Sequence, residues 1–155
     1  MDMRFRAAFL LLFLFYPFSL SASSTRADAL NLSAYKGKVV YLDFWASWCI
    51  PCRLSFPWMN DLQNTLGNRG FVVVAVDVDH DRELADEFLQ ANDAQFRIVY
   101  DPEGAIARKY NFRDMPTSIL IGRDGKIRSV HNGFFPNREG SYLSDIYTLL
   151  DEGTH

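Results

Sequence analysis

Apolar residues follow two different spacings along the chain, and the alternation of the two predicts strands and helices in turn. Continuous runs rich in Val, Tyr, Leu, Phe and Trp predict a strand buried on both faces at residues 38–46 and a second buried strand at 71–78. A short strand is predicted at residues 96–100. Apolar side chains three or four positions apart predict helices at residues 52–66, from Asp81 onward, at 102–110 and at 138–151. The apolar faces of three of these helices are Leu54, Trp58, Leu62 and Leu66; Leu84, Ala85, Phe88 and Leu89; and Tyr142, Leu143, Ile146, Leu149 and Leu150.

Capping and turn residues mark the ends of these elements. Asp81 can cap the second helix, and Pro102 suits a position near the start of the third. Two further strands, at residues 117–121 and 126–131, flank Gly122-Arg123-Asp124-Gly125, where Asp-Gly would supply the positive φ angles of a hairpin turn. The order β-α-β-α-β-α-β-β-α predicts an α/β fold in which a mixed central sheet carries helices on both faces.

The N-terminal residues look like an export signal. Arg4 and Arg6 precede a nearly continuous apolar stretch at residues 7–20, and small residues follow at 21–24. The stretch is shorter than the ~20 residues that span a bilayer comfortably. We therefore expect residues 1–23 to be a cleaved signal peptide, with an uncleaved membrane anchor as the alternative, and residues 30–152 to form the folded domain. Export would place that domain in the bacterial periplasm.

Charge and cysteine content narrow the function. The chain has 155 residues, enough for one domain, and its formal net charge of -3 gives no electrostatic reason to expect a nucleic acid partner. Its two cysteines, Cys49 and Cys52, stand three positions apart. An exported domain stapled by disulfides normally carries about four or more cysteines, spread along the chain. One close pair therefore indicates redox chemistry.

The segment Trp48-Cys49-Ile50-Pro51-Cys52 lies where a buried strand is predicted to end and a helix to begin. A helix N-terminus stabilises a thiolate, the reactive form of cysteine, through its free N–H groups. We expect Cys49 to be exposed at the helix start and Cys52, within one turn, to be close enough to form a disulfide. Pro51 suits the first turn because an N–H there would have no partner within the helix.

A metal site or a purely structural disulfide would use the same pair differently. Zinc needs four ligands, or three and a water, and His80, His131 and His155 stand at no ligand spacing from the cysteines. A bridge over three positions closes too small a loop to stabilise the fold much. We therefore expect neither use, and no metal or other cofactor.

The segment from Lys36 to Cys52 resembles the active-site segment of the thioredoxin superfamily, and its Gly37-Lys38-Val39-Val40 start is most similar to the exported thioredoxins of the TlpA/ResA/CcmG type. Pro57 falls where thioredoxins kink the active-site helix, and Met115-Pro116-Thr117 resembles their cis-proline segment. The likeness covers residues 30–150. It implies a thioredoxin-like fold and a protein thiol–disulfide oxidoreductase that helps to mature c-type cytochromes or keeps other exported thiols reduced.

The resemblance also implies roles for individual residues. Cys49 would form a mixed disulfide with the substrate, and Cys52 would resolve it. Pro116 would be cis and would pack beside the disulfide, where its segment pairs with the substrate backbone. The residues expected to contact substrate are Trp48, Ile50, Pro51, Met115 and Thr117.

Three other side chains near the motif have two interpretations each. Trp45 and Trp48 would flank the site with apolar surface or serve only as core or rim packing. Arg53, directly after Cys52, would bias the thiolate electrostatically or simply face solvent.

Asp43 stands in an otherwise apolar strand, where an unpaired carboxylate is costly. Thioredoxins carry an acid at this position beneath the second cysteine, and the resemblance implies that Asp43 relays protons for Cys52. A raised pKa would suit that role, and the alternative is a structural Asp satisfied by local hydrogen bonds. Thioredoxin also places a lysine near this acid, whereas the matching residues 73–76 offer none.

The expected direction of electron flow follows from thiolate stabilisation. Ile50 and Pro51 offer no side-chain donor and Pro51 lacks an N–H, so we expect a reductant rather than a strong oxidant. The expected partners are protein thiols and disulfides and a membrane-bound electron donor. We expect the protein itself to be a monomer. Alternatives on the same fold are a disulfide-forming oxidant, a peroxiredoxin-like peroxidase, and a copper chaperone with His131 as a ligand.

Overall fold

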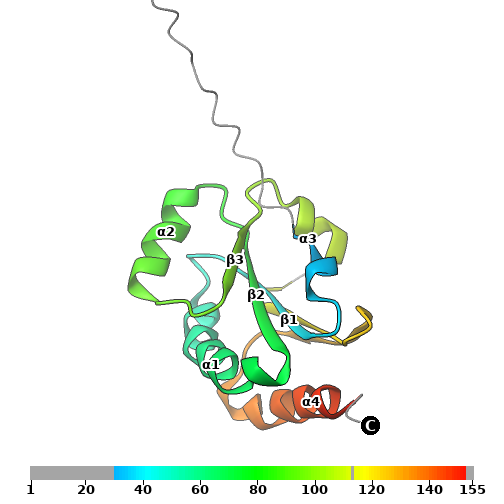
Figure 1. Ribbon diagram of the computed structural model, residues 1–155. Coiled ribbons are helices and arrows are strands. Elements are labelled where there is room, and N and C mark those ends of the chain that lie inside the picture. The colour runs from blue at the N-terminus through cyan, green and yellow to red at the C-terminus, as the bar shows by residue number, and fades with distance from the viewer. Residues whose placement is uncertain (1–29, 113, 153–155) are drawn as a thin grey trace, which may run out of the picture.

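The computed structural model describes residues 30–112 and 114–152 of the chain (Figure 1). The strands are β1 (Val39–Trp45), β2 (Phe71–Asp77), β3 (Arg97–Tyr100), β4 (Thr117–Ile121) and β5 (Ile127–Asn132). The α-helices are α1 (Ile50–Leu66), α2 (Arg82–Ala91), α3 (Ala105–Tyr110) and α4 (Glu139–Asp151), and the 3-10 helices are η1 (Leu32–Tyr35), η2 (Gly67–Arg69) and η3 (Pro136–Arg138). The signal peptide or anchor predicted at residues 1–23 lies outside the described residues. Within the described residues, no helix has the length and apolar character needed to cross a membrane.

The strands form one mixed sheet in the order β3-β2-β1-β4-β5. β1 pairs in parallel with β2, and β2 with β3, whereas the β1–β4 and β4–β5 pairs are antiparallel. Helices α1 and α2 connect the parallel strands, because a parallel return needs a crossover, while a short turn joins β4 to β5. The predicted element order and the α/β, thioredoxin-like architecture are confirmed.

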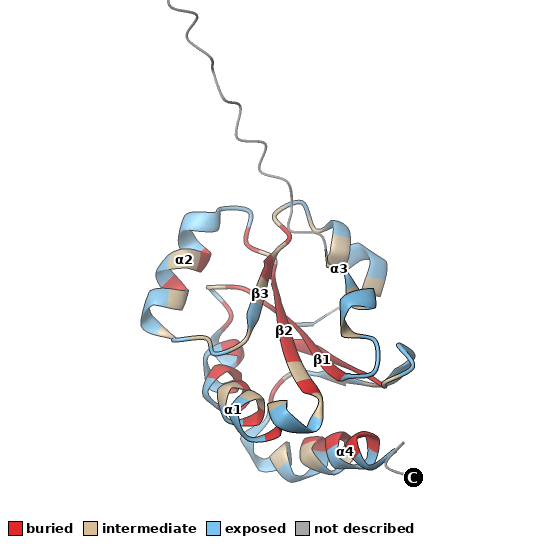
Figure 2. Cartoon of the chain, in the orientation of Figure 1, coloured by how far each residue is buried: buried red, intermediate tan, exposed pale blue. Residues whose placement is uncertain are grey.

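Helices cover both faces of the sheet (Figure 1). α1, α2 and α4 pack on one face and form the larger core with side chains such as Trp45 and Phe56. η1 and α3 pack on the other face over Leu42 and Phe44. Strand β1 is buried along its whole length (Figure 2), because it lies between two strands and beneath helices on both faces. Its carboxyl end leads directly to Cys49.

The second helix begins directly after Asp81, as predicted, but one residue expected on its buried face is exposed. The Asp81 carboxylate accepts a hydrogen bond from the Glu83 N–H at 3.0 Å, as expected of an N-cap. The prediction that Leu84 faces the core is wrong, because the residue is 46% exposed, and Leu54 on the first helix, at 56% exposed, is wrong for the same reason. The buried side of α2 is centred near Ala85 and Phe88, about a quarter turn around the helix from Leu84.

Two turns also differ from their predictions. The third helix begins at Ala105 and excludes Pro102, because Gly104 adopts a left-handed φ of 66° that cannot continue a right-handed helix. In the β4–β5 turn, Gly125 has a φ of 79°, whereas Asp124 does not have a positive φ. The Asp124 carboxylate instead accepts the backbone N–H two residues further on, at 3.1 Å. One left-handed glycine and one side-chain hydrogen bond therefore shape this turn.

Candidate active site

The two cysteines lie at the junction of β1 and α1. Cys49 is the N-cap residue of α1, which begins at Ile50 and has Pro51 in its first turn. The Cys49 Sγ accepts a hydrogen bond from the Cys52 N–H at 3.3 Å. Cys49 and Cys52 form a disulfide, with their Cα atoms 5.3 Å apart. The pair therefore lies at the positive end of the α1 dipole, where a thiolate is stabilised.

The disulfide is less exposed than the sequence predicted. Cys49 exposes 4% of its surface and Cys52 exposes none, so the prediction of an exposed Cys49 is wrong for the oxidised protein. Both side chains belong to the larger core, and the Cys49 sulfur is bonded to that of the fully buried Cys52. The neighbouring Trp48 and Ile50 are 65% and 74% exposed. Apolar surface thus flanks a nearly buried redox pair.

Trp45 takes no part in that exposed surface. Its ring is fully buried against Phe56 and Phe88, with centroid distances of 4.9 Å and 4.7 Å. The packing interpretation therefore holds for Trp45. Arg53 is exposed, which agrees with the interpretation that its side chain faces solvent. It also donates a hydrogen bond to the Ser47 carbonyl at 3.1 Å, which ties the first turn of α1 to the preceding loop.

A carboxylate that the sequence analysis did not single out holds the loop before Cys49. Asp79 is 3% exposed and accepts hydrogen bonds from the Ser47 N–H at 2.7 Å and the Ser47 hydroxyl at 3.1 Å. The Asp79 N–H donates to Asp77, and burial, helped by a side-chain hydrogen bond with Asp79, raises the pKa of Asp77 to about 8. The sequence did contain one signal for Asp79, namely an acidic residue directly after a predicted buried strand. Because β2 ends beside β1, this carboxylate reaches the active-site loop.

Asp43 is buried in the centre of the sheet, with 1% of its surface exposed. Its Oδ1 accepts a hydrogen bond from the Ser118 hydroxyl on β4 at 2.6 Å, and its Oδ2 has no partner among the described residues. Burial raises the pKa of Asp43 to about 7, although the Ser118 hydrogen bond lowers it. Asp43 therefore combines one local hydrogen bond with a carboxyl that titrates near neutral pH. Ser118 was not identified from the sequence, since nothing local distinguishes this serine.

The side chain of Asp43 lies on the same face of the sheet as the cysteines. Residues two apart on a strand share a face, so Asp43 points to the side of Tyr41 and Trp45, and those residues share a core cluster with Cys52. The residue opposite Asp43 on β2 is Ala75. The lysine of thioredoxin therefore has no counterpart at this place.

The predicted cis-proline is confirmed, since the Met115–Pro116 peptide bond is cis. It leads into β4, where the buried Thr117 lies opposite Phe44 near the carboxyl end of β1. The Thr117 hydroxyl donates a hydrogen bond to the Asp114 carbonyl at 2.6 Å. Met115 is partly buried and packs against the core cluster that contains both cysteines. The structure thus brings the cis-proline segment and the disulfide to the same end of the sheet.

The histidines considered as metal ligands have other partners. His131 Nε2 lies 3.0 Å from Asp145 Oδ2, and His80 Nδ1 lies 2.7 Å from the Pro102 carbonyl oxygen. Across residues 30–112 and 114–152, no three His, Cys, Asp or Glu side chains form a group able to hold a metal ion. His155 lies outside the described residues.

Comparisons with known sequences agree with this geometry. The family model described as Redoxin matches residues 15–150. The thiol-disulfide oxidoreductase ResA of Oceanobacillus iheyensis is 34% identical over 132 residues, which are 83% of this chain and 69% of that protein. ResA of Bacillus subtilis is 30% identical over 129 residues, covering 83% of this chain and 70% of that protein. The chain spans less of other relatives, such as 57% of ResA from Bacillus thuringiensis.

Solved structures are similar as well. A thiol:disulfide interchange protein DsbE from Chlorobium tepidum is 47% identical, with a TM-score of 0.76 over 77% of this chain and 84% of that chain. The exposed lipoprotein thioredoxin Etrx1 from Streptococcus pneumoniae is 31% identical, with a TM-score of 0.67 over 76% of this chain and 90% of that chain. The names of these relatives refer to thiol–disulfide exchange or to thioredoxin.

Proposed function

The chain belongs to the Redoxin family and is a thioredoxin-like thiol–disulfide oxidoreductase similar to ResA and CcmG, and from this premise we propose that it reduces disulfides in exported proteins. The observation that carries the proposal is the place of the redox pair. Cys49 caps α1 and receives the Cys52 N–H at 3.3 Å, while Pro51 contributes no N–H to that sulfur.

The reaction we propose is exchange through a mixed disulfide. The Cys49 thiolate attacks one sulfur of a substrate disulfide, and the other substrate sulfur leaves as a thiolate that takes up a proton. Cys52 then loses its proton and attacks the Cys49 sulfur, which forms the Cys49–Cys52 disulfide and releases the second substrate sulfur, again to be protonated. Two electrons and two protons pass to the substrate. A donor dithiol restores the pair by the reverse sequence.

We assign Asp43 as the group that takes the proton from Cys52. The assignment is supported by its burial on the face that carries the cysteines and by its raised pKa, about 7. A base whose pKa lies near the working pH can both accept and release a proton. Ser118 supports the assignment too, because its hydroxyl holds one carboxyl oxygen and leaves the other without a partner among the described residues.

We propose that the substrate polypeptide lies over the disulfide. On the α1 side it would contact Trp48, Ile50 and Pro51, and the exposure of the first two supports this. On the other side, the segment of Met115, cis-Pro116 and Thr117 would pair with the substrate backbone. The packing of Met115 against the cluster that contains both cysteines supports this position.

Beyond the N-terminus of α1, little further stabilises the Cys49 thiolate, and this favours a reductant over an oxidant. Strong oxidants depend on a strongly stabilised thiolate, and neither Ile50 nor Pro51 has a side chain that donates a hydrogen bond. We propose that the protein works outside the cytoplasm, in the bacterial periplasm, as a monomer without a cofactor. A membrane-bound donor would recharge it, and proteins such as apocytochrome c would be its substrates.

The reduction potential tests this direction of electron flow. We expect the Cys49–Cys52 couple to equilibrate with glutathione at a potential nearer to about -270 mV, the value of thioredoxin, than to about -120 mV, the value of a strong oxidant. The Cys49→Ser variant, which cannot form the disulfide, gives the baseline. A measured potential above about -150 mV would overturn the proposal of a reductant.

A further inference from the structure

A row of polar side chains crosses the sheet from Asp43 to its edge. Asp43 on β1 lies opposite Ser118 on β4, and Ser118 lies opposite His131 on the edge strand β5. Directly opposed residues of antiparallel strands point to the same face. The three side chains therefore lie in one line on the face covered by α1 and α4, with β1 and β5 about 10 Å apart. Such a row is unexpected in a core that is otherwise apolar here.

A carboxylate on α4 fixes the imidazole of His131. His131 Nε2 lies 3.0 Å from Asp145 Oδ2, and the imidazole packs against the Tyr142 ring with a centroid distance of 4.8 Å. A carboxylate can only accept a hydrogen bond, so Nε2 carries the hydrogen. In the neutral imidazole, Nδ1 is then the acceptor nitrogen. Asp145 therefore selects the tautomer whose Nδ1 can accept a proton from the interior.

The two ends of the row both leave a buried polar atom without a partner. Asp43 Oδ2 and His131 Nδ1 are inaccessible to solvent and have no hydrogen-bond partner among the described residues. Buried polar atoms are nearly always paired, so two such atoms in one row require an explanation. Ser118 lies between Asp43 and His131 in the strand register, and its hydroxyl donates to the other Asp43 oxygen, Oδ1. A hydroxyl can accept one proton while it donates another.

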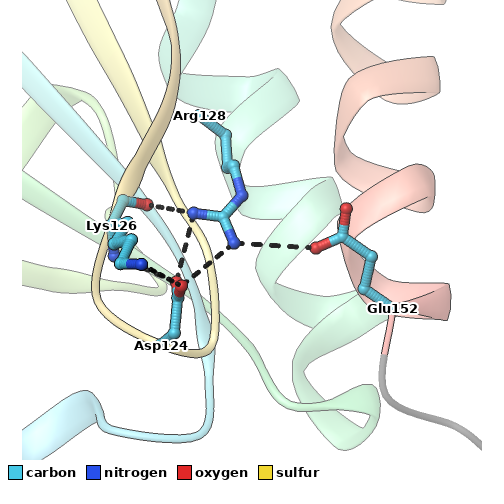
Figure 3. A network of polar contacts seen from close by, with 4 residues as sticks. All are labelled: Asp124, Lys126, Arg128 and Glu152. Carbon is cyan, nitrogen blue, oxygen red and sulfur yellow. Dashed lines mark hydrogen bonds and ion pairs between the residues drawn. The ribbon is translucent and has the colours of Figure 1, made fainter.

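The outer end of the row reaches solvent beside a cavity between β5 and α4. The side chain of His131 is 15% exposed and that of Asp145 is 44% exposed. Asp145 also lines a cavity of about 250 Å³ together with Ser129. Arg128, which bridges Asp124 and Glu152 at 3.2 Å and 3.9 Å (Figure 3), lines the same cavity. Charged, water-accessible groups therefore stand next to His131.

We propose that Ser118 and His131, with Asp145 holding the imidazole, form the path by which the proton that Asp43 takes from Cys52 leaves for solvent. This inference rests on the proposed role of Asp43 in resolving the mixed disulfide. The Ser118 hydroxyl donates to Asp43 Oδ1 in the structure, so it must first turn away from that oxygen. It then accepts the proton from the protonated Asp43 carboxyl while its own proton passes to His131 Nδ1, and the imidazolium releases its Nε2 proton toward Asp145 and water. The departing substrate thiolate takes up a proton from solvent, so the number of protons balances.

Other titratable groups face this row without competing for the proton. Tyr41 lies beside Asp43 on β1, and burial raises the pKa of Tyr41 well above its usual value, so its hydroxyl keeps its proton. α4 contributes Tyr142 against the His131 ring, and α1 contributes the cysteines themselves. β2 contributes Ala75, which carries no ionisable group.

The reaction of the reduced protein with an aromatic disulfide, 5,5′-dithiobis(2-nitrobenzoate), separates the relevant steps. A first coloured thiolate is released when Cys49 attacks, and a second when Cys52 resolves the mixed disulfide. In His131→Gln, whose amide can still donate to Asp145, we expect an unchanged first phase and a second phase slowed about tenfold or more. In His131→Ala, added imidazole should restore the second phase and saturate, since the neighbouring cavity admits it.

The matched control is His80→Gln, which removes an imidazole that bonds only a backbone carbonyl and should leave both phases unchanged. An unchanged second phase in both His131 variants, with a slow one in Asp43→Asn, would overturn the path while leaving the proposed role of Asp43 intact. A slow second phase in the His131 variants that imidazole does not restore, together with a lowered urea midpoint, would assign His131 a structural role. That result would also overturn the proposed proton path. If the unsubstituted protein showed no first phase, Cys49 would not be the nucleophile and the proposed function would fail first.

Discussion

Replacing Asp43 by Asn removes a buried ionisable group at nearly constant shape, and the effect on stability can be worked out from the structure. Burial raises the pKa of this carboxyl from 3.8 to about 7. Each pKa unit corresponds to about 1.4 kcal/mol, so the ionised carboxylate destabilises the folded state by about 4 kcal/mol relative to the neutral acid. Asn cannot ionise, and its folded state carries no such penalty.

The sign of the effect sets a pH window. Because the folded protein holds this proton more tightly than the unfolded chain, the contribution of Asp43 is fully favourable below about pH 4 and is lost as the pH rises through about 7. The Asn variant should therefore match the unsubstituted protein near pH 4 and exceed its free energy of unfolding by about 4 kcal/mol near pH 8. Asp77, whose pKa is about 8, gives a similar slope in both proteins and cancels in the difference.

Urea unfolding of the oxidised proteins across this range measures the difference, because the disulfide keeps both cysteines from titrating. In the reduced proteins, the same substitution should slow the second phase of the aromatic disulfide reaction by about a hundredfold and spare the first. If the difference in free energy of unfolding between the two proteins did not vary with pH, the raised pKa of the buried Asp43 carboxyl would be refuted. An Asn variant that is less stable throughout but resolves mixed disulfides normally would make Asp43 a structural residue.

Two further predictions concern the cysteines and the loop before them. In the reduced protein, iodoacetamide should modify Cys49 well before Cys52, because Cys49 caps α1 while Cys52 is fully buried. Peptide mass analysis of partly labelled protein measures this order. Equal labelling of the two cysteines would show that Cys49 is not the activated thiol. Asp79→Asn leaves one of the two Ser47 donors without an acceptor, so it should lower the free energy of unfolding at pH 7 by about 1–3 kcal/mol and change the alkylation rate of Cys49. An unchanged urea midpoint would show that the Ser47 contacts contribute nothing.

Local patterns were sufficient for most of the secondary structure and for the redox pair. Apolar spacing identified each strand and helix because burial on one face or two imposes a period that can be counted along the chain. The cysteine pair could be found because both members fall within one helical turn, and the place of Cys49 at the start of a helix followed from the strand before it. Errors arose at Leu54, Leu84, Pro102 and Asp124, and in the exposure expected of Cys49, because each outcome depended on how one residue or turn is placed against its neighbours.

The environment of the cysteines depended on strand order and register, which no local period contains. Asp43 and Ser118 are separated by 75 positions, and Ser47 and Asp79 by 32, yet each pair is joined by a hydrogen bond. Ser118 is an ordinary serine until β4 pairs with β1, and His131 is an ordinary histidine until β5 takes its place beside β4. Local signals in the chain were enough to place the helices and strands and to identify the cysteine pair. Strand pairing, in contrast, sets which carboxyl has a pKa raised toward neutral pH and which polar side chains line up beside it across the sheet, because a pKa depends on burial and on neighbours from distant strands.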